Sequence, residues 1–403
     1  MKNINKFASF SIVFAPLLEP YVLPGTSINL DVAFLFITSI ICLGNKRQEG
    51  FQLPYKLSMF IGYALIIPVA GLLYYSDFTG LKSSYISTIL YVLNILLIIP
   101  HVKIEYVLKF FKYLVLVSGF VLIVQEFMFA TMGYRFSALI PFLPIKYDST
   151  TTDAYMQSQM LRTRSSSFFL EPAHLAQYLL AYLSICLANN IRNKKLISKS
   201  LLLTLLFLML TWSGNAILVA PLLIIYYILF SEINISKKVF AIAIIFAGIT
   251  YIQSTSKGSE LLSRTEELSY DGSQRISSGT MRIFRGYYVF DAMPQTQKIA
   301  GVGSGYCSNV IEDSSSFWMF SGSERYINNI QELLIAYGII GTFLFLLHLF
   351  GLYKYSWHYG RMLIIAFLGL CFIEQFWLGP KMFLYLGLAI SFSRQQDYFK
   401  NAK

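Results

Sequence analysis

The segment from Arg162 to His174 combines side chains that can bind phosphate with side chains that can move a proton. Arg162 and Arg164 present planar forks of N–H donors that match phosphate oxygens. Glu171 or His174 could accept a proton from a hydroxyl group. Pro172 favours a helix that starts at this point. Residues three positions apart share a helix face, so Glu171 and His174 should lie together. The segment therefore predicts chemistry on a phosphate-bearing substrate.

A second segment with similar chemistry lies far downstream, where Arg282 and Arg285 are followed by Tyr287 and Tyr288. Eight of the twelve arginines, but only three lysines, fall in two long polar stretches, 133–167 and 254–330. Arginine is favoured over lysine where planar, bidentate recognition of phosphate is required. Two alternatives stay open: the arginines could pair with acidic residues of the same stretch, and the tyrosines could pack the loop core instead of stacking on a ligand.

Composition places these segments in a membrane protein. Hydrophobic residues make up 56% of the 403 residues and charged residues only 13%, roughly half of the 25% that is usual in soluble proteins. Apolar runs of about 17 to 25 residues, each long enough to cross a bilayer, recur along the chain. We predict an all-α bundle of about 12 transmembrane helices. Their centres lie near Val13, Phe36, Leu65, Val92, Val117, Leu180, Phe207, Leu223, Ile244, Phe343, Leu368 and Gly387.

The basic residues predict how the bundle is oriented. Alternate connections between the apolar runs are rich in lysine, which favours the cytoplasmic side. With both termini in the cytoplasm, residues 1–132 form helices one to five, 133–167 a first external loop, 168–253 helices six to nine, 254–330 a second external loop and 331–403 the last three helices and a tail. The second loop is too aromatic for a disordered linker, so we expect a partly helical cap. The net charge of +11 is mostly this topogenic charge and indicates no nucleic-acid partner.

Other site chemistries find no support in the sequence. The four cysteines are scattered and form no disulfide framework. No Cys/His cluster has zinc spacing, and no glycine-rich nucleotide loop appears. Six acids fall near the external ends of their predicted helices, namely Glu19, Asp31, Glu126, Glu171, Glu332 and Glu374. Acids within membrane helices usually face a cavity, so we expect an acidic crevice beneath the arginine-rich loops, although any one acid could be a helix cap.

Three stretches resemble the bacterial O-antigen and capsule polysaccharide polymerase family. Arg164–His174 is similar to that family's arginine-to-Glu-Pro signature. Ser278–Arg285, with Pro294 and the turn Gly301-Val-Gly303-Ser-Gly305, is similar to its second arginine segment and Gly-x-Gly turn. Asn328–Gly341 resembles the start of the helix that follows. The motifs are short, while the similarity in topology extends along nearly the whole chain.

The resemblance implies a GT-C-like glycosyltransferase that uses no metal ion and no cofactor. Such an enzyme transfers a growing glycan from undecaprenyl diphosphate to a lipid-linked repeat unit, on the outer face of the cytoplasmic (inner) membrane. Its partners would be that lipid-linked oligosaccharide, membrane lipids and, in some systems, a chain-length regulator protein.

Within this reaction we expect Arg164 and Arg282 to neutralise the charge of the departing diphosphate, with Glu171 or His174 as the base. Diphosphate and sugar binding would involve Arg162, Arg285, Tyr287, Tyr288 and Asn328.

Two other functions remain open. An O-antigen ligase shares this architecture, but ligases typically carry a histidine just before the helix after the large loop, and no histidine occurs from Cys307 to Phe345. A polysaccharide or lipid-carrier exporter would explain the bundle and the external acids. It would not explain two arginine-rich loops on one side of the membrane.

Overall fold

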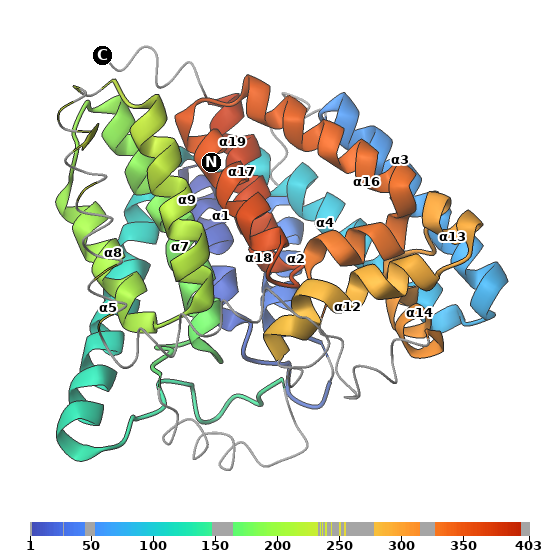
Figure 1. Ribbon diagram of the computed structural model, residues 1–403, viewed down its shortest axis with the longest axis horizontal. Helices are drawn as coiled ribbons and strands as arrows, with labels where there is room; N and C mark the ends of the chain where they lie inside the picture. Colours follow the sequence, from blue (N-terminus) through green and yellow to red (C-terminus); the bar gives the residue numbers. More distant parts are fainter. Residues whose placement is uncertain are drawn as a thin grey trace.

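The computed structural model describes residues 2–26, 28–44, 53–146, 164–232, 278–314 and 327–395, with a few isolated positions between 234 and 254. The described chain is all-helical and contains no strand. Its α-helices, shown in Figure 1, are α1 (Lys2–Phe14), α2 (Leu30–Leu43), α3 (Tyr55–Tyr75), α4 (Phe78–Leu97), α5 (Ile104–Met132), α7 (Pro172–Arg192), α8 (Lys199–Thr211), α9 (Gly214–Phe230), α12 (Ser278–Ala292), α13 (Gln295–Ala300), α14 (Cys307–Asp313), α16 (Asn329–Tyr355), α17 (His358–Cys371), α18 (Pro380–Met382) and α19 (Leu388–Arg394). Short η segments are η1 (Ala15–Leu18), η2 (Ile99–His101), η4 (Ser304–Tyr306) and the π-helical η5 (Phe383–Gly387).

The predicted apolar segments correspond to helices. Eleven of the twelve predicted centres fall within helical segments, and Ile244 lies outside the described residues. Four described helices, α3, α4, α5 and α16, are long and apolar enough to cross a membrane. Several others are shorter, among them α2 and α17 with 14 residues each. At 1.5 Å per residue these two are about 21 Å long, less than a hydrocarbon core of about 30 Å.

Helix α7 forms the centre of the bundle. Every residue from Leu175 to Ala188 is buried, as expected for a helix that is apolar on all sides. It packs against α5, α8, α9 and α17. The hydroxyl of Tyr178 donates to the carbonyl of Val13, at 2.8 Å, and the hydroxyl of Tyr385 donates to the carbonyl of Gln177, at 2.6 Å. These contacts fix the start of α7, where Pro172 is the first helical residue and Glu171 the N-cap.

The described part of the second predicted loop is helical and is anchored to the bundle through a glycine turn. Helix α16 contains a break at Gly338, where φ is +61°, and its two parts run in different directions (Figure 1). The break leaves the Ala336 carbonyl without its helical partner, and the amides of Val302 and Gly303 donate to it at 3.0 and 2.7 Å. A Cβ on Gly301 would lie 2.4 Å from the same carbonyl oxygen, so only glycine permits this approach.

The same turn contacts the long helices beside it. Tyr306 is completely buried and donates from its hydroxyl to the carbonyl of Asp77, at 2.7 Å. A Cβ on Gly80 would lie 2.6 Å from the Tyr306 ring. The segment from α12 to α14 is therefore fixed to α3, α4 and α16, with α12 below the first part of α16 in Figure 1.

Candidate functional site

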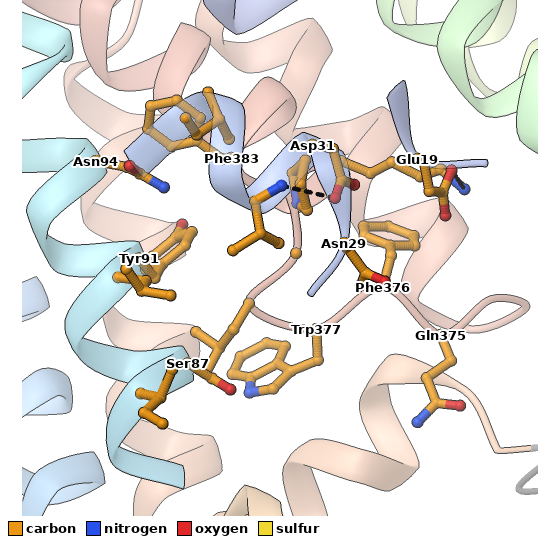
Figure 2. Close-up of a pocket in the computed structure, with 18 of the residues that line it drawn as sticks. Glu19, Asn29, Asp31, Ser87, Tyr91, Asn94, Gln375, Phe376, Trp377 and Phe383 are labelled. Atoms are coloured by element: carbon orange, nitrogen blue, oxygen red, sulfur yellow. Dashed lines mark hydrogen bonds and ion pairs between the residues drawn. The ribbon is translucent and has the colours of Figure 1, made fainter. Parts of the chain in front are cut away.

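A cavity of about 490 Å³ opens where η1, α2, α4, α7, α16 and the α17–α18 connection meet. Its walls carry an unusual density of polar groups for the interior of an apolar bundle. Figure 2 shows them projecting from several separate elements toward one space. The polar and aromatic lining includes Glu19, Asn29, Asp31, Ser87, Tyr91, Asn94, Lys146, His174, Glu332, Gln375, Trp377 and Lys381.

At one side of the cavity, the carboxylate of Glu19 lies near a lysine and a histidine. Its Oε2 lies 2.8 Å from Nζ of Lys381 and 3.7 Å from Nδ1 of His174. Lys381 is only 6% exposed, and a buried charge of this kind requires an opposite charge nearby. Burial alone would raise the pKa of Glu19, which lies between η1 and α2. The charge of Lys381 outweighs that effect and lowers the pKa to about 2, so Glu19 stays ionised at physiological pH.

His174 lies beside this pair, at a distance too long for a hydrogen bond. The negative charge near Nδ1 electrostatically favours the tautomer that carries its proton there, which leaves Nε2 as the basic nitrogen. Among the described residues, Nε2 of His174 has no partner. The ring also lies close enough to Glu171 and Glu374 to interact with them electrostatically. The geometry therefore suits proton transfer at Nε2.

The second arginine segment reaches the same region through Glu374. One guanidinium nitrogen of Arg282, in α12, lies 3.1 Å from Oε1 of Glu374. The side-chain amide of Asn215 donates to the same oxygen at 2.9 Å, and it also donates to the carbonyl of Ala173 at 3.4 Å. Ala173 is the neighbour of His174 in α7. Arg282 is thereby linked to the start of α7 through a single carboxylate and a single amide.

Arg164, in the first arginine segment, contacts the residue that ends α8, three positions before Asn215. Arg164 donates to the carbonyl of Trp212, at 3.1 Å. Trp212 is in the left-handed conformation, with φ +47°, and ends α8. Helix α9 then begins at Gly214, so Asn215 lies in its first turn. Arg164 and Arg282 come from the two predicted external loops. Arg164 contacts Trp212, just before α9, whereas Arg282 is connected to α9 only indirectly, through Glu374 and Asn215.

The remaining predicted residues fall into distinct environments. Glu171 is the N-cap of α7 but makes no side-chain capping hydrogen bond, and it does not line the cavity. Arg285 is 1% exposed, while Tyr287 and Tyr288 are 40% and 47% exposed. Both tyrosines are therefore partly covered and partly exposed. Arg162 lies outside the described residues.

Asn328 has the contacts of a structural residue. Its side-chain amide donates to the carbonyls of Arg282 and Phe372, both at 3.0 Å. Its Oδ1 accepts from the amide of Gln331, at 3.0 Å, in a capping box that starts α16. These contacts tie α12 to the α17–α18 connection, so Asn328 positions Arg282.

The predicted acids separate into two groups. Glu19, Asp31 and Glu332 line the cavity, and Glu374 lies beside His174. Glu126 instead belongs to a separate cluster with Arg135 and Ser165.

Most of the cavity lining was not predicted from the sequence, including Tyr91, Asn94, Trp377 and Lys381. Trp377 lies in the connection between α17 and α18, and Lys381 lies in α18. Asn215, which contacts Glu374, was not predicted either. A lysine in an otherwise apolar stretch is the signal that could have identified Lys381, because such residues usually face a cavity. Within the described chain, no group of three or more His, Cys, Asp or Glu side chains is arranged to hold a metal ion. No protein-family model matches this chain, and no curated protein matches it either.

Proposed function

We propose that the protein is a polysaccharide polymerase that transfers a growing glycan from a polyprenyl diphosphate carrier to a lipid-linked repeat unit, at the external side of the cytoplasmic membrane. One observation carries the proposal. Arginines from two segments far apart in sequence lie around the starts of α7 and α9: Arg164 contacts Trp212, and Arg282 contacts Glu374, which Asn215 of α9 also contacts. His174 lies in the same region, beside the carboxylate of Glu19.

The arginines supply what a diphosphate leaving group needs. As the bond between sugar and phosphate breaks, negative charge builds up on the phosphate oxygens, and preorganised donors stabilise it best where water is scarce. A guanidinium group has five N–H donors. The carboxylate of Glu374 holds the Arg282 fork in position, and the 28% exposure of the Arg282 side chain lets a phosphate oxygen approach it.

The acceptor hydroxyl must lose a proton as it attacks the sugar. In this proposal Nε2 of His174 takes that proton, and Glu19 stabilises the imidazolium that results. Glu171 is the alternative base, because it lies one helical turn away. The position of His174 in the cavity wall favours the histidine.

The depth of the cavity suits a substrate held by a membrane lipid. Helices α2 and α17 flank it and are about 21 Å long, so their external ends would lie below the surface of a bilayer with a core of about 30 Å. A carrier lipid with its diphosphate at headgroup depth could then approach sideways between the longer helices.

Deletion of the protein tests the proposal against its competitors. A cell without a polymerase still makes and exports the single lipid-linked repeat unit but forms no long chains, as judged by the ladder of glycan products on a gel. Loss of a ligase leaves long chains on the carrier instead. If export of the single unit also stops, the exporter function is supported and the polymerase proposal fails.

A further inference from the structure

The cavity extends away from His174, between α2 and α4, into a region that the proposed chemistry does not use. Asp31, Tyr91 and Asn94 line this part, and their exposed fractions are only 1%, 4% and 8%. Trp377 forms the opposite wall (Figure 2). Its Nε1 donates to the hydroxyl of Tyr337, at 3.3 Å, so the indole ring is held in place.

These buried polar groups are incompletely paired within the described chain. Oδ1 of Asp31 accepts from the amide of Val32, at 2.7 Å, and Oδ2 has no partner. Oδ1 of Asn94 accepts from the hydroxyl of Ser39, at 2.9 Å, and Nδ2 has no partner. No described residue pairs with the Tyr91 hydroxyl. All three residues line the cavity. Polar groups inside a protein normally form hydrogen bonds, so a ligand or water in the cavity would complete those of these three side chains.

The mixture of groups indicates what kind of ligand fits. An ion would require groups of one sign, whereas here a carboxyl oxygen, an amide N–H₂ and a phenol hydroxyl surround the same space. Each hydroxyl of a sugar both donates and accepts a hydrogen bond, and a flat aromatic ring such as that of Trp377 can cover a face of a sugar ring. The volume of about 490 Å³ is within the range of about 300–1,000 Å³ for small-molecule sites.

The charged residues of the cavity wall further limit which sugars can bind. Glu19, Asp31 and Glu332 contribute carboxyl groups. Lys381 pairs with Glu19, so these two charges offset each other. The charges that remain in the wall are the carboxyl groups of Asp31 and Glu332 and the exposed amine of Lys146. A sugar that carries a carboxylate would meet mainly like charge there, and juxtaposed like charges oppose binding.

We propose that this part of the cavity is the acceptor-sugar subsite, and that it takes an uncharged sugar ring and discriminates against acidic sugars. The inference rests on the proposed polymerase function and assigns one side of its site. The donor's diphosphate contacts Arg164 and Arg282, so the sugar in the Asp31–Tyr91–Asn94 region is the one whose hydroxyl faces His174. The residue of the repeat unit that receives the new bond is therefore uncharged.

Reconstituted full-length protein tests the subsite. The substrate is the lipid-linked repeat unit extracted from cells that lack the protein, and the rate of chain extension is measured against its concentration. Tyr91→Phe removes one hydroxyl and should raise KM about 2- to 10-fold, as expected for one neutral hydrogen bond. Asp31→Ala removes a carboxyl group that can both bind and orient a sugar hydroxyl, so it should raise KM by at least as much as Tyr91→Phe. kcat should change little in Tyr91→Phe.

Tyr85→Phe is the matched control, because Tyr85 lies on the same helix, α4, but not in the cavity wall. Its KM should equal that of the wild type. Linkage analysis of the finished polymer provides a second readout and should find an uncharged sugar at the accepting position. Unchanged KM in both Tyr91→Phe and Asp31→Ala, or an acidic sugar at that position, would refute the subsite while the polymerase function stands. Failure of the wild-type protein to extend the lipid-linked unit would refute the polymerase function itself.

Discussion

Two clusters of arginine, glutamate and hydroxyl or amide groups involve the predicted external loops, and they differ in how exposed their arginines are. In the first, Arg135 is 2% exposed and its guanidinium lies 3.1 Å from Glu126 and 2.7 Å from the hydroxyl of Ser165. Ser165 in turn donates to Glu126, at 2.6 Å, and the ring of Phe129 lies 3.5 Å from the guanidinium carbon. This cluster closes on itself and ties the first loop to the end of α5.

The second cluster surrounds Glu374 and His174 and stays open toward the cavity. Arg282 is 28% exposed in its side chain, and the imidazole of His174 is 18% exposed. The contrast shows that the arginines of the two predicted external loops lie in two different environments. One arginine stabilises a loop, while others are placed where a ligand could reach them. The two roles can be distinguished by the contacts and the exposure of each arginine, but not by the fact that it is an arginine.

The largest expected effect is that of His174→Gln. Glutamine retains a polar side chain but cannot act as a base near neutral pH, and loss of a general base typically lowers kcat about 100- to 10,000-fold. Wild-type activity should fall on the acid side of its pH profile, because protonation of Nε2 removes the lone pair that accepts the proton. That acid limb should be absent from the residual activity of the variant. An unchanged rate and profile would remove His174 from the mechanism.

Arg164→Ala and Arg282→Ala should have the next largest effect. Loss of one donor to a developing negative charge typically costs about 100- to 1,000-fold in kcat. Lysine at either position should restore activity only partly, because it supplies charge without the planar fork. The glycan ladder gives the readout, and immunoblotting of membranes controls for protein amount. Arg361→Ala at the start of α17 serves as the control. Wild-type ladders in both alanine variants would contradict the diphosphate site.

Much of the fold was predictable from the sequence, because apolar runs determine where helices form in a membrane protein. The predicted centres near Phe207 and Leu223 are only 16 residues apart, yet they lie in separate helices, since α8 ends at Thr211 and α9 begins at Gly214. The break in α16 was not predictable. The residues around Gly338 continue an apolar run, and the break depends on backbone donors from Val302 and Gly303, which lie far away in sequence.

The candidate site was predictable only in part, for a related reason. The arginines, Glu171 and His174 could be picked out from the sequence because side chains of these types bind phosphate or transfer protons. Their partners could not be predicted, because Glu374 and Asn215 come close to Arg282 only in the tertiary fold. Nothing in the sequence indicated that the side chain of Asn328 would cap a helix.

Arg135→Ala tests the closed cluster and should affect stability more than catalysis. Removing one partner of a buried ion pair leaves the other charge uncompensated and typically costs about 3–5 kcal/mol. We expect a lower melting temperature in detergent and less protein in the membrane, with nearly normal kcat for each folded molecule. A variant of normal stability that lacks activity would instead assign Arg135 to the substrate site and abolish the distinction between the two clusters.

Glu171→Gln should have the smallest effect and decides between the two candidate bases. The substitution keeps the size of the side chain and removes its charge. Because Glu171 lies outside the cavity wall and makes no capping hydrogen bond, helix α7 should tolerate it. A charge near the first helical turn contributes only about 0.3–1 kcal/mol through the helix dipole. We therefore expect less than about a tenfold change in the rate of chain extension, since 1.36 kcal/mol corresponds to tenfold. The comparison with His174→Gln must use matched amounts of protein in the same reconstituted system. If Glu171→Gln lowers the rate of chain extension more than His174→Gln does, the base is Glu171 at the N-cap of α7. The Glu19–Lys381 pair then lies beside His174 for a purpose other than proton transfer.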